Sequence, residues 1–369
     1  MTDPRTEPGA ERETETTPSN RRLTVDGLKT YLACPRRFQF EHGQVLRTDE
    51  ETPQADRLDL LRGAICGALR AGDVDTLADR ILERFRTRWE DYGEGFHSRT
   101  QRDHERRVLE AAIRAYVEAV GRDHADALYT TRSTGVDGEL VGPRLPLTVP
   151  ISIGRSDDGT NRSSADSPPE SDSSTITLRS SVDYVFFEGS TVVGVSFVAT
   201  SRHLGLLRYA DEWEGDVEAA FTDHVDDGDG FEPRLVATLC ETAAVLEGLR
   251  RLRDRLELDE GRTCRYLQVP LLDRDQLSIN HLQGDVQTSL EAIDLTDPYL
   301  DHQTFGMTLE HRNDRVDGYL RSVAMGATSG PYEPGSGDRW DAISRSVCPR
   351  CPYAVCCPEY VSEEVAFDG

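Results

Sequence analysis

Residues 348–358 read Cys-Pro-Arg-Cys-Pro-Tyr-Ala-Val-Cys-Cys-Pro, and residues 31–38 read Tyr-Leu-Ala-Cys-Pro-Arg-Arg-Phe. The late segment contains a C-x2-C-x5-C pattern, and the early segment adds one distant cysteine. The four cysteines are Cys34, Cys348, Cys351 and Cys357. Thiolates are soft ligands that suit an iron-sulfur cluster or a tetrahedral zinc ion. The sequence therefore predicts one metal site that joins the first structured segment to the last.

Other uses of these cysteines remain open. C-x2-C is also a zinc half-site, although zinc ribbons normally present two close pairs and Cys34 is solitary. The four thiols can also be buried without a ligand. Cys356 neighbours Cys357 and is the alternative ligand, with x4 spacing. The remaining cysteines lie in apolar surroundings and are interpreted as plain buried thiols: Cys66, Cys240 and Cys264.

The charge balance is strongly acidic. The chain of 369 residues has 67 acidic and 42 basic side chains, for a net charge of −25, and Lys29 is its only lysine. This pattern indicates adaptation to a cytoplasm of high salt, where screening removes self-repulsion. No apolar run reaches the length of a membrane span and no signal peptide is evident, so we expect a cytoplasmic protein with no membrane partner.

Periodicity predicts one α/β domain over residues 21–369, after a disordered tail at 1–20. A Ser, Asp, Pro and Gly-rich segment at 155–174 is predicted as a disordered insertion, and 327–338 as a linker into the cysteine cluster at 348–357. We expect helices ending at Cys34 and at 55–69, 77–89, 99–123, 233–256, 285–295 and 308–325. We expect strands at 145–153, 175–187, 191–199 and 263–272.

The early Cys-Pro-Arg-Arg-Phe and the late C-x2-C-x5-C together resemble the iron-sulfur branch of the RecB-type PD-(D/E)XK nucleases, which includes the AddB nuclease domain and the CRISPR-associated exonucleases. The resemblance covers the two ends of the chain. It implies a restriction-endonuclease-like mixed sheet flanked by helices. It also implies a structural [4Fe-4S] cluster on the four cysteines, with zinc as the alternative.

The resemblance implies Asp183 as the first Mg²⁺ ligand, but the partner positions are changed. Ser196 stands where the second carboxylate belongs, Val198 where the lysine belongs, and Gly67 where a further ligand histidine belongs. A neutral serine does not replace a bridging carboxylate, and valine has neither charge nor proton. We therefore expect a degenerate centre with Asp183 as a relic, which leaves Mg²⁺ binding and nuclease activity unsupported.

The sequence thus predicts a non-cutting accessory of DNA repair or recombination that binds DNA or a helicase. An active exonuclease with an unrecognised site is one alternative, and a scaffold or zinc-binding interaction domain without nucleic acid is another. The basic face of the helix at 99–123 is interpreted as solvated and ion-paired. Candidate phosphate contacts are Arg36, Arg37, Arg202, Arg208, Arg250, Arg251 and Arg253.

Overall fold

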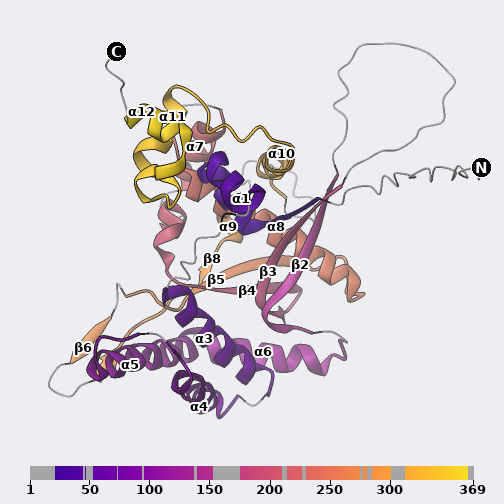
Figure 1. Cartoon of the computed structure of the whole chain (residues 1–369). Coiled ribbons are helices and arrows are strands. Elements are labelled where there is room, and N and C mark those ends of the chain that lie inside the picture. The colour runs from indigo at the N-terminus through magenta and orange to yellow at the C-terminus, as the bar shows by residue number, and fades with distance from the viewer. Residues whose placement is uncertain are drawn as a thin grey trace, which may run out of the picture.

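The computed structural model is an α/β protein in which helices flank a mixed sheet (Figure 1). The predicted tail at 1–20 and the predicted insertion at 155–174 both lie outside the described residues. The structure describes residues 21–44, 46, 53–72, 74–93, 95–136, 139–152, 175–209, 214–226, 230–274, 277–280, 285–300 and 312–364.

The sheet is built around β3 (Thr175–Glu188). β2 (Val141–Ser152) runs antiparallel along one side of β3. β1 (Arg21–Thr24) pairs in parallel with the first part of β3, and β4 (Thr191–Val198) pairs antiparallel with its last part. The β3–β4 hairpin forms as predicted, and Gly189 supplies the positive φ of 56° that its tight turn needs.

The sheet continues from β4 to β5 (Thr263–Pro270), which is parallel to β4, and then to the two-residue β8 (Ile293–Asp294). The parallel pair is joined through α8 (Pro233–Arg255), as parallel strands require a crossover. Buried side chains cover almost every face of α8, because other helices pack around it on the sheet.

Helices lie on both sides of the sheet, and Figure 1 shows α8 on one side and α3 on the other. The α3 side carries α3 (Pro53–Leu69), α4 (Leu77–Glu90), α5 (Arg99–Tyr116) and α6 (Arg122–Ser133). A π-helical turn at Val117–Gly121 joins α5 to α6, so the helical stretch predicted to end at residue 123 continues to Ser133.

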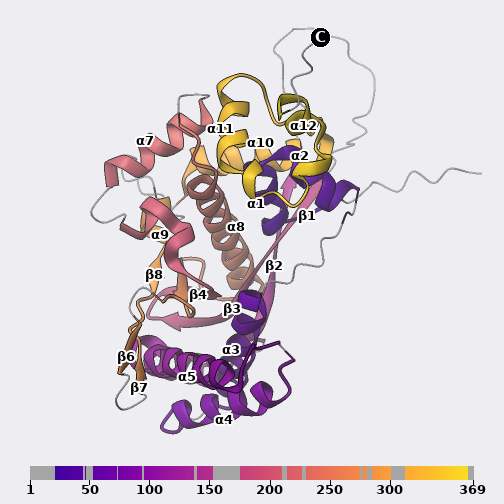
Figure 2. The same ribbon diagram turned by 60° about the vertical axis from the view of Figure 1, so that its left-hand side comes forward.

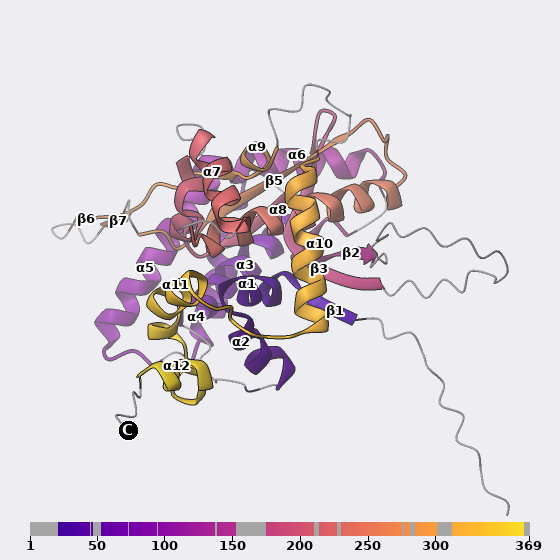
Figure 3. The ribbon, with the colours of Figure 1, turned by 90° about the horizontal axis from the view of Figure 1, so that it is seen from above.

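The N-terminal and C-terminal helices gather at one end of the molecule (Figures 2 and 3). Thr24 caps the first of them by accepting a hydrogen bond from Gly27 N at 3.0 Å, and this helix ends at Cys34, as predicted. These helices are α1 (Val25–Ala33), α2 (Pro35–Phe38), α10 (Asp314–Ser329), α11 (Asp338–Ser346) and α12 (Pro358–Glu364).

Two helix predictions near the C-terminal third differ from the structure. The helix predicted at 285–295 is wrong: β7 (Asp285–Gln287) pairs with β6 (Ser278–Asn280). Val286 is buried in a small cluster with Val108 and Ala111 of α5, and this tertiary contact outweighs the weak helical pattern. The helix predicted at 308–325 corresponds to α10, which extends to Ser329, three residues into the predicted linker.

The remaining elements connect these layers. None of the described helices is both long and apolar enough to cross a membrane. The other helical segments are Gln39–Gly43, Ser201–Tyr209, α7 (Glu214–Val225), α9 (Thr296–Tyr299), Cys348–Arg350 and Ala354–Cys356.

Candidate functional site

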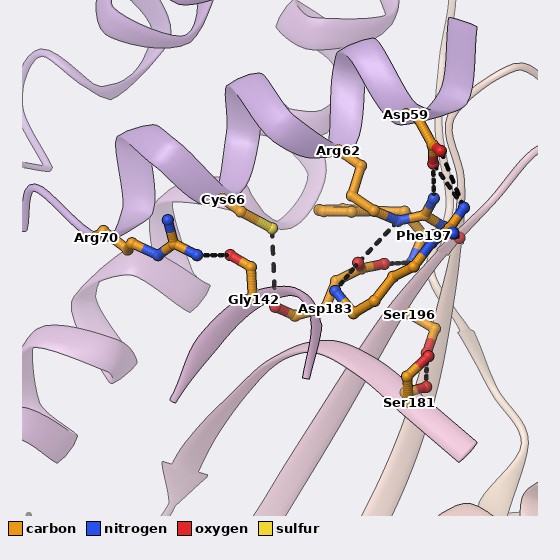
Figure 4. Close-up of polar contacts among 10 residues, drawn as sticks. Asp59, Arg62, Cys66, Arg70, Gly142, Ser181, Asp183, Ser196 and Phe197 are labelled. Carbon is orange, nitrogen blue, oxygen red and sulfur yellow. Dashed lines mark hydrogen bonds and ion pairs between the residues drawn. The ribbon is translucent and has the colours of Figure 1, made fainter. Parts of the chain in front are cut away.

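Asp183 lies on β3, where the neighbours of that strand change, and its side chain is buried (Figure 4). Arg62 of α3 places its Nε atom 2.8 Å from Asp183 Oδ1. The main-chain N–H of Arg144 donates to the same oxygen at 3.2 Å, and that of Phe197 donates to Oδ2 at 2.7 Å. Both oxygens of Asp183, which we expected to be a relic of a metal site, are therefore engaged by the protein itself.

Arg62 is held at this position by two further acceptors. Its Nη2 donates to the carbonyl of Phe197 at 2.8 Å, and its Nη1 pairs with Asp59. Asp59 also accepts from Nη2 of Arg144 at 2.9 Å and 3.0 Å. Two guanidinium groups, of Arg62 and Arg144, thus face two carboxylates, of Asp59 and Asp183, and their charges balance. We call the contact at the centre of this arrangement the Asp183–Arg62 pair.

Burial controls the electrostatics of this site. Burial raises the pKa of the Asp183 carboxyl, while the Arg62 charge and the N–H groups of Phe197 and Arg144 act in the opposite direction. The side chain of Arg62 is itself 10% exposed, so water screens the pair weakly. A buried pair of this kind is costly to break, because the remaining charge stays buried without a partner.

The other positions that the resemblance implies do not converge on Asp183. The Ser196 hydroxyl is turned toward the Ser181 carbonyl, to which it donates at 3.4 Å (Figure 4). Besides Arg62, α3 places Cys66 near Asp183, and the Cys66 thiol lies 3.7 Å from the main-chain oxygen of Asp183. Gly67 instead lies next to Arg84 of α4. These residues give Asp183 no second carboxylate.

Lys29 belongs to a different polar network. Its Nζ lies 2.7 Å from Glu241 of α8, and the hydroxyl of Tyr266 donates to the same carboxylate at 3.0 Å. Gln268 Nε2, on β5, in turn donates to the Tyr266 hydroxyl at 3.1 Å. Burial alone would lower the pKa of Lys29, but the Glu241 carboxylate raises it above its ordinary value. This chain of contacts joins α1 to α8 and β5.

A buried group of hydroxyl and imidazole side chains lies between α5, α6 and β3. Tyr184 places its hydroxyl 3.1 Å from that of Tyr116 and 2.6 Å from Nδ1 of His124. Burial lowers the pKa of His124 to about 4. The buried position of His124 and its contact with Tyr184 give it a structural role in the protein interior.

The four predicted ligand cysteines lie at the end of the molecule where the N-terminal and C-terminal segments meet. Cys34 and Cys348 are buried in one cluster with Ile343. Cys357 is buried in a second cluster, against which Cys351 packs. Cys356, by contrast, is exposed, so Cys357 is the member of this adjacent pair that faces the protein.

Contacts other than the cysteines hold the same two segments together. Arg36 forms an ion pair with Glu359, and the rings of Phe40 and Tyr353 lie 5.4 Å apart. The Tyr353 hydroxyl donates to the carbonyl of Leu46 at 2.6 Å. We call these contacts between residues 34–46 and 348–360 the terminal clasp.

Burial and nearby N–H groups act in opposite directions on the pKa values of two clasp cysteines, and burial has the larger effect. Burial raises the pKa of the Cys34 thiol, while the N–H groups of Arg36 and Arg37 favour its thiolate. Burial likewise raises the pKa of Cys357, against the N–H groups of Tyr360 and Glu359. Within the described ranges, no three His, Cys, Asp or Glu side chains form a group arranged to hold a metal ion.

Most of the arginines predicted as phosphate contacts form ion pairs with acidic side chains of the same chain. Arg202 also has an interaction partner, and the side chain of Arg208 lies outside the described part of the structure. On α5, Arg106 pairs with Glu110 at 2.9 Å, in the predicted i, i+4 arrangement. The internal pairs are Arg36–Glu359, Arg37–Glu41, Arg250–Glu247, Arg251–Glu247 and Arg253–Asp254.

No family model matches this chain, and no curated protein or solved structure is significantly similar to it.

Proposed function

We propose that this chain is a catalytically degenerate relative of the RecB-type PD-(D/E)XK nucleases, which binds DNA or a helicase in repair or recombination without cutting DNA. The observation that carries the proposal is the Asp183–Arg62 pair. The carboxylate that the resemblance implies as a Mg²⁺ ligand already forms an ion pair with the Arg62 guanidinium. It also accepts hydrogen bonds from two main-chain N–H groups.

The chemistry of phosphodiester hydrolysis explains why this pair argues against cutting. A catalytic metal ion lowers the pKa of a bound water and stabilises the charge that develops on the phosphate. The Arg62 guanidinium supplies charge but is a poor acid or base and coordinates no water. It is also held by Asp59 and by the Phe197 carbonyl, so it is not free to leave Asp183.

The order of the elements supports the proposed family. A helix (α3) precedes three antiparallel strands (β2, β3 and β4), and α8 then leads to β5, which is parallel to β4. This order is compatible with the restriction-endonuclease-like sheet that the resemblance implies. Fold alone does not define activity, and the assignment of a non-cutting role rests on the Asp183–Arg62 pair.

A cleavage and binding assay tests the proposal. Full-length protein and its Asp183→Ala variant are incubated with end-labelled single-stranded and duplex DNA, with Mg²⁺ or Mn²⁺, in buffers that range from low salt to molar KCl. We expect binding by the wild-type protein and no cutting by either protein. Metal-dependent cutting that disappears in Asp183→Ala would overturn the degenerate assignment.

We also propose that the terminal clasp holds a [4Fe-4S] cluster on Cys34, Cys348, Cys351 and Cys357. The donor set fits, because four thiols from both segments lie in two adjoining clusters. Because the described residues contain no preformed group of three ligands, cluster binding must bring the thiols together. The cluster would supply a structural cross-link between the two segments.

Anaerobic purification tests the cluster. We expect brown protein that contains iron and acid-labile sulfide in equal amounts, and loss of both in Cys34→Ser and Cys351→Ser. Cys356→Ser is the matched control, since this thiol is exposed, and it should retain the iron. A colourless protein loaded with zinc, or equal iron loss in the Cys356→Ser control, would contradict the proposed ligand set.

A further inference from the structure

A groove of about 560 Å³ lies along α4, on the face whose Arg84 and Arg88 lie beside Gly67 and Gly63 of α3, and we call it the α3–α4 groove. Three of its six lining residues are arginines, in a protein whose acidic residues outnumber the basic ones by 67 to 42. The lining residues are Ala71, Arg80, Glu83, Arg84, Thr87 and Arg88.

Side chains of α4 form most of the lining of this groove and lie beside two glycines of α3. Arg80, Arg84 and Arg88 are spaced four residues apart and therefore lie on one face of α4. Gly63 and Gly67 have the same spacing on α3 and offer no side chain to that face. A Cβ at Gly63 would lie 2.8 Å from Arg88 Nη1, and one at Gly67 would lie 3.2 Å from Arg84 Nη1. The two guanidinium groups thus lie directly against the backbone of α3.

The charges of Arg84 and Arg88 are available to a ligand. Both side chains are exposed, and neither forms an ion pair or hydrogen bond with the residues that the structure describes. Arg86, on the same helix, differs, because its Nε lies 3.0 Å from Oε1 of Glu110, a carboxylate that also pairs with Arg106 and Arg114. Glu83 is the single acidic residue that lines the groove, so its local charge is positive.

The chemistry of the lining selects phosphate groups. Guanidinium groups bind phosphate through two parallel hydrogen bonds, and one helical turn separates successive arginines by roughly 6 Å. This separation is comparable to that of neighbouring phosphates along a nucleic-acid strand. The lining contains the Thr87 hydroxyl but no aromatic ring on which a base would stack.

We propose that the α3–α4 groove binds successive phosphates of a nucleic-acid strand and reads no sequence. The inference rests on the proposed DNA-binding function and assigns it to a surface outside the Asp183–Arg62 pair. Contacts to phosphates position a protein on nucleic acid without distinguishing bases. Binding of this kind weakens steeply as salt rises, because it depends on the release of counterions.

Fluorescence anisotropy of the full-length protein with a labelled oligothymidylate and a labelled duplex tests the groove. The double variant Arg84→Gln with Arg88→Gln should bind at least about tenfold more weakly than wild type. For the single strand, the negative slope of log association constant against log salt concentration should become shallower by about 1.4, because two phosphate contacts are lost. Arg86→Gln removes the same type of charge from the opposite face of α4 and should leave affinity unchanged.

The outcomes separate this inference from the proposed function. If wild type binds DNA and the double variant binds equally well, or Arg86→Gln loses as much affinity, the groove is overturned while DNA binding stands. If wild type binds neither probe at low salt, the groove inference fails together with the DNA-binding form of the proposed function, and the helicase-binding form stands. Pyrophosphate is the small-phosphate competitor: it should displace the strand weakly, and tight binding of pyrophosphate without oligonucleotide binding would overturn the strand assignment. Thermal unfolding of each variant confirms that it is folded.

Discussion

At the scale of single residues, the Asp183 carboxylate receives partners from three parts of the chain. Arg62 comes from α3, the Phe197 N–H from β4 and the Arg144 N–H from β2. A metal ion at the same carboxylate would be exchangeable and would keep open positions for water and substrate. A guanidinium attached to the protein is not exchangeable, so the pair stabilises the junction of α3 with the sheet.

Removal of this charge should destabilise the protein. We expect Asp183→Asn to lower the free energy of unfolding by about 3 kcal/mol, because the buried Arg62 then keeps only the half-exposed Asp59 as a carboxylate partner. Urea unfolding of the wild type and the variant measures the loss. Asp59→Asn is the control, since Asp59 is half exposed and should cost about 1 kcal/mol or less.

A double variant makes this prediction sharper. Asp183→Asn combined with Arg62→Gln should lose less stability than the sum of the two single variants, because neither charge is then left alone. Strict additivity would show that Asp183 and Arg62 do not stabilise each other.

His124 makes the stability depend on pH. Its pKa is lowered from 6.5 to about 4 in the folded protein, so the unfolded chain binds a proton that the folded protein does not. Stability should therefore fall as pH drops from about 6.5 toward 4, by up to about 1.4 kcal/mol per pH unit for one histidine. His224, whose pKa burial lowers to about 3, acts with the same sign.

Unfolding measured across this pH range tests the His124 contribution. The His124→Gln variant should show a shallower decline in the free energy of unfolding than the wild type. An unchanged pH dependence in that variant would rule His124 out as a source of the acid sensitivity. Replacement of both histidines should make the decline shallower still, and the lowered pKa values of Glu110 and Glu359 account for part of what remains.

At the scale of elements, two helical glycines make opposite predictions. A Cβ at Gly248 of α8 would lie 2.7 Å from Leu147 Cβ of β2, whereas a Cβ at Gly318 of α10 meets nothing within 4 Å. Gly248→Ala should destabilise the protein by about 1–3 kcal/mol through overpacking. Gly318→Ala should stabilise it by up to about 1 kcal/mol through helix propensity. Thermal unfolding of both variants measures the signs, and a gain for Gly248→Ala would contradict the close packing of α8 on β2.

Elements with strong periodic patterns could be predicted from the sequence. The β3–β4 hairpin and α8 follow continuous apolar patterns, and α1 ends at Cys34 as Pro35 requires. The helix predicted at 285–295 fails because only three residues pair as β7, and their partner and their contact with α5 are tertiary. Short segments of this kind carry too little pattern to identify.

The candidate site was predictable in part. Asp183 could be singled out through the resemblance, but its pairing with Arg62 depends on how α3 lies against the sheet, across 121 residues of sequence. The α3–α4 groove did carry a signal. Gly63 and Gly67, then Arg80, Arg84 and Arg88, repeat at four-residue spacing, and two such repeats on consecutive helices indicate facing stripes.

At the scale of the whole molecule, the net charge of −25 should make stability depend on salt. As KCl rises from about 0.1 M to about 1 M, the screening length falls from about 10 Å to about 3 Å, and repulsion among surface carboxylates decreases. We expect the melting temperature to rise over this range. Sucrose at matched osmolarity is the control, and an equal rise in sucrose would show that charge screening is not the cause.

The terminal clasp also has a consequence for the order in which the protein is made. Residues 34–46 leave the ribosome early, but their partners at 348–360 are synthesised about three hundred residues later. At about 5–20 residues per second, the early segment waits roughly 15–60 s with Phe40 uncovered. Folding of this region therefore finishes only after residues 348–360 have been synthesised. A ribosome that stops before Cys348 would release a chain that chaperones and proteases recognise by this exposed segment.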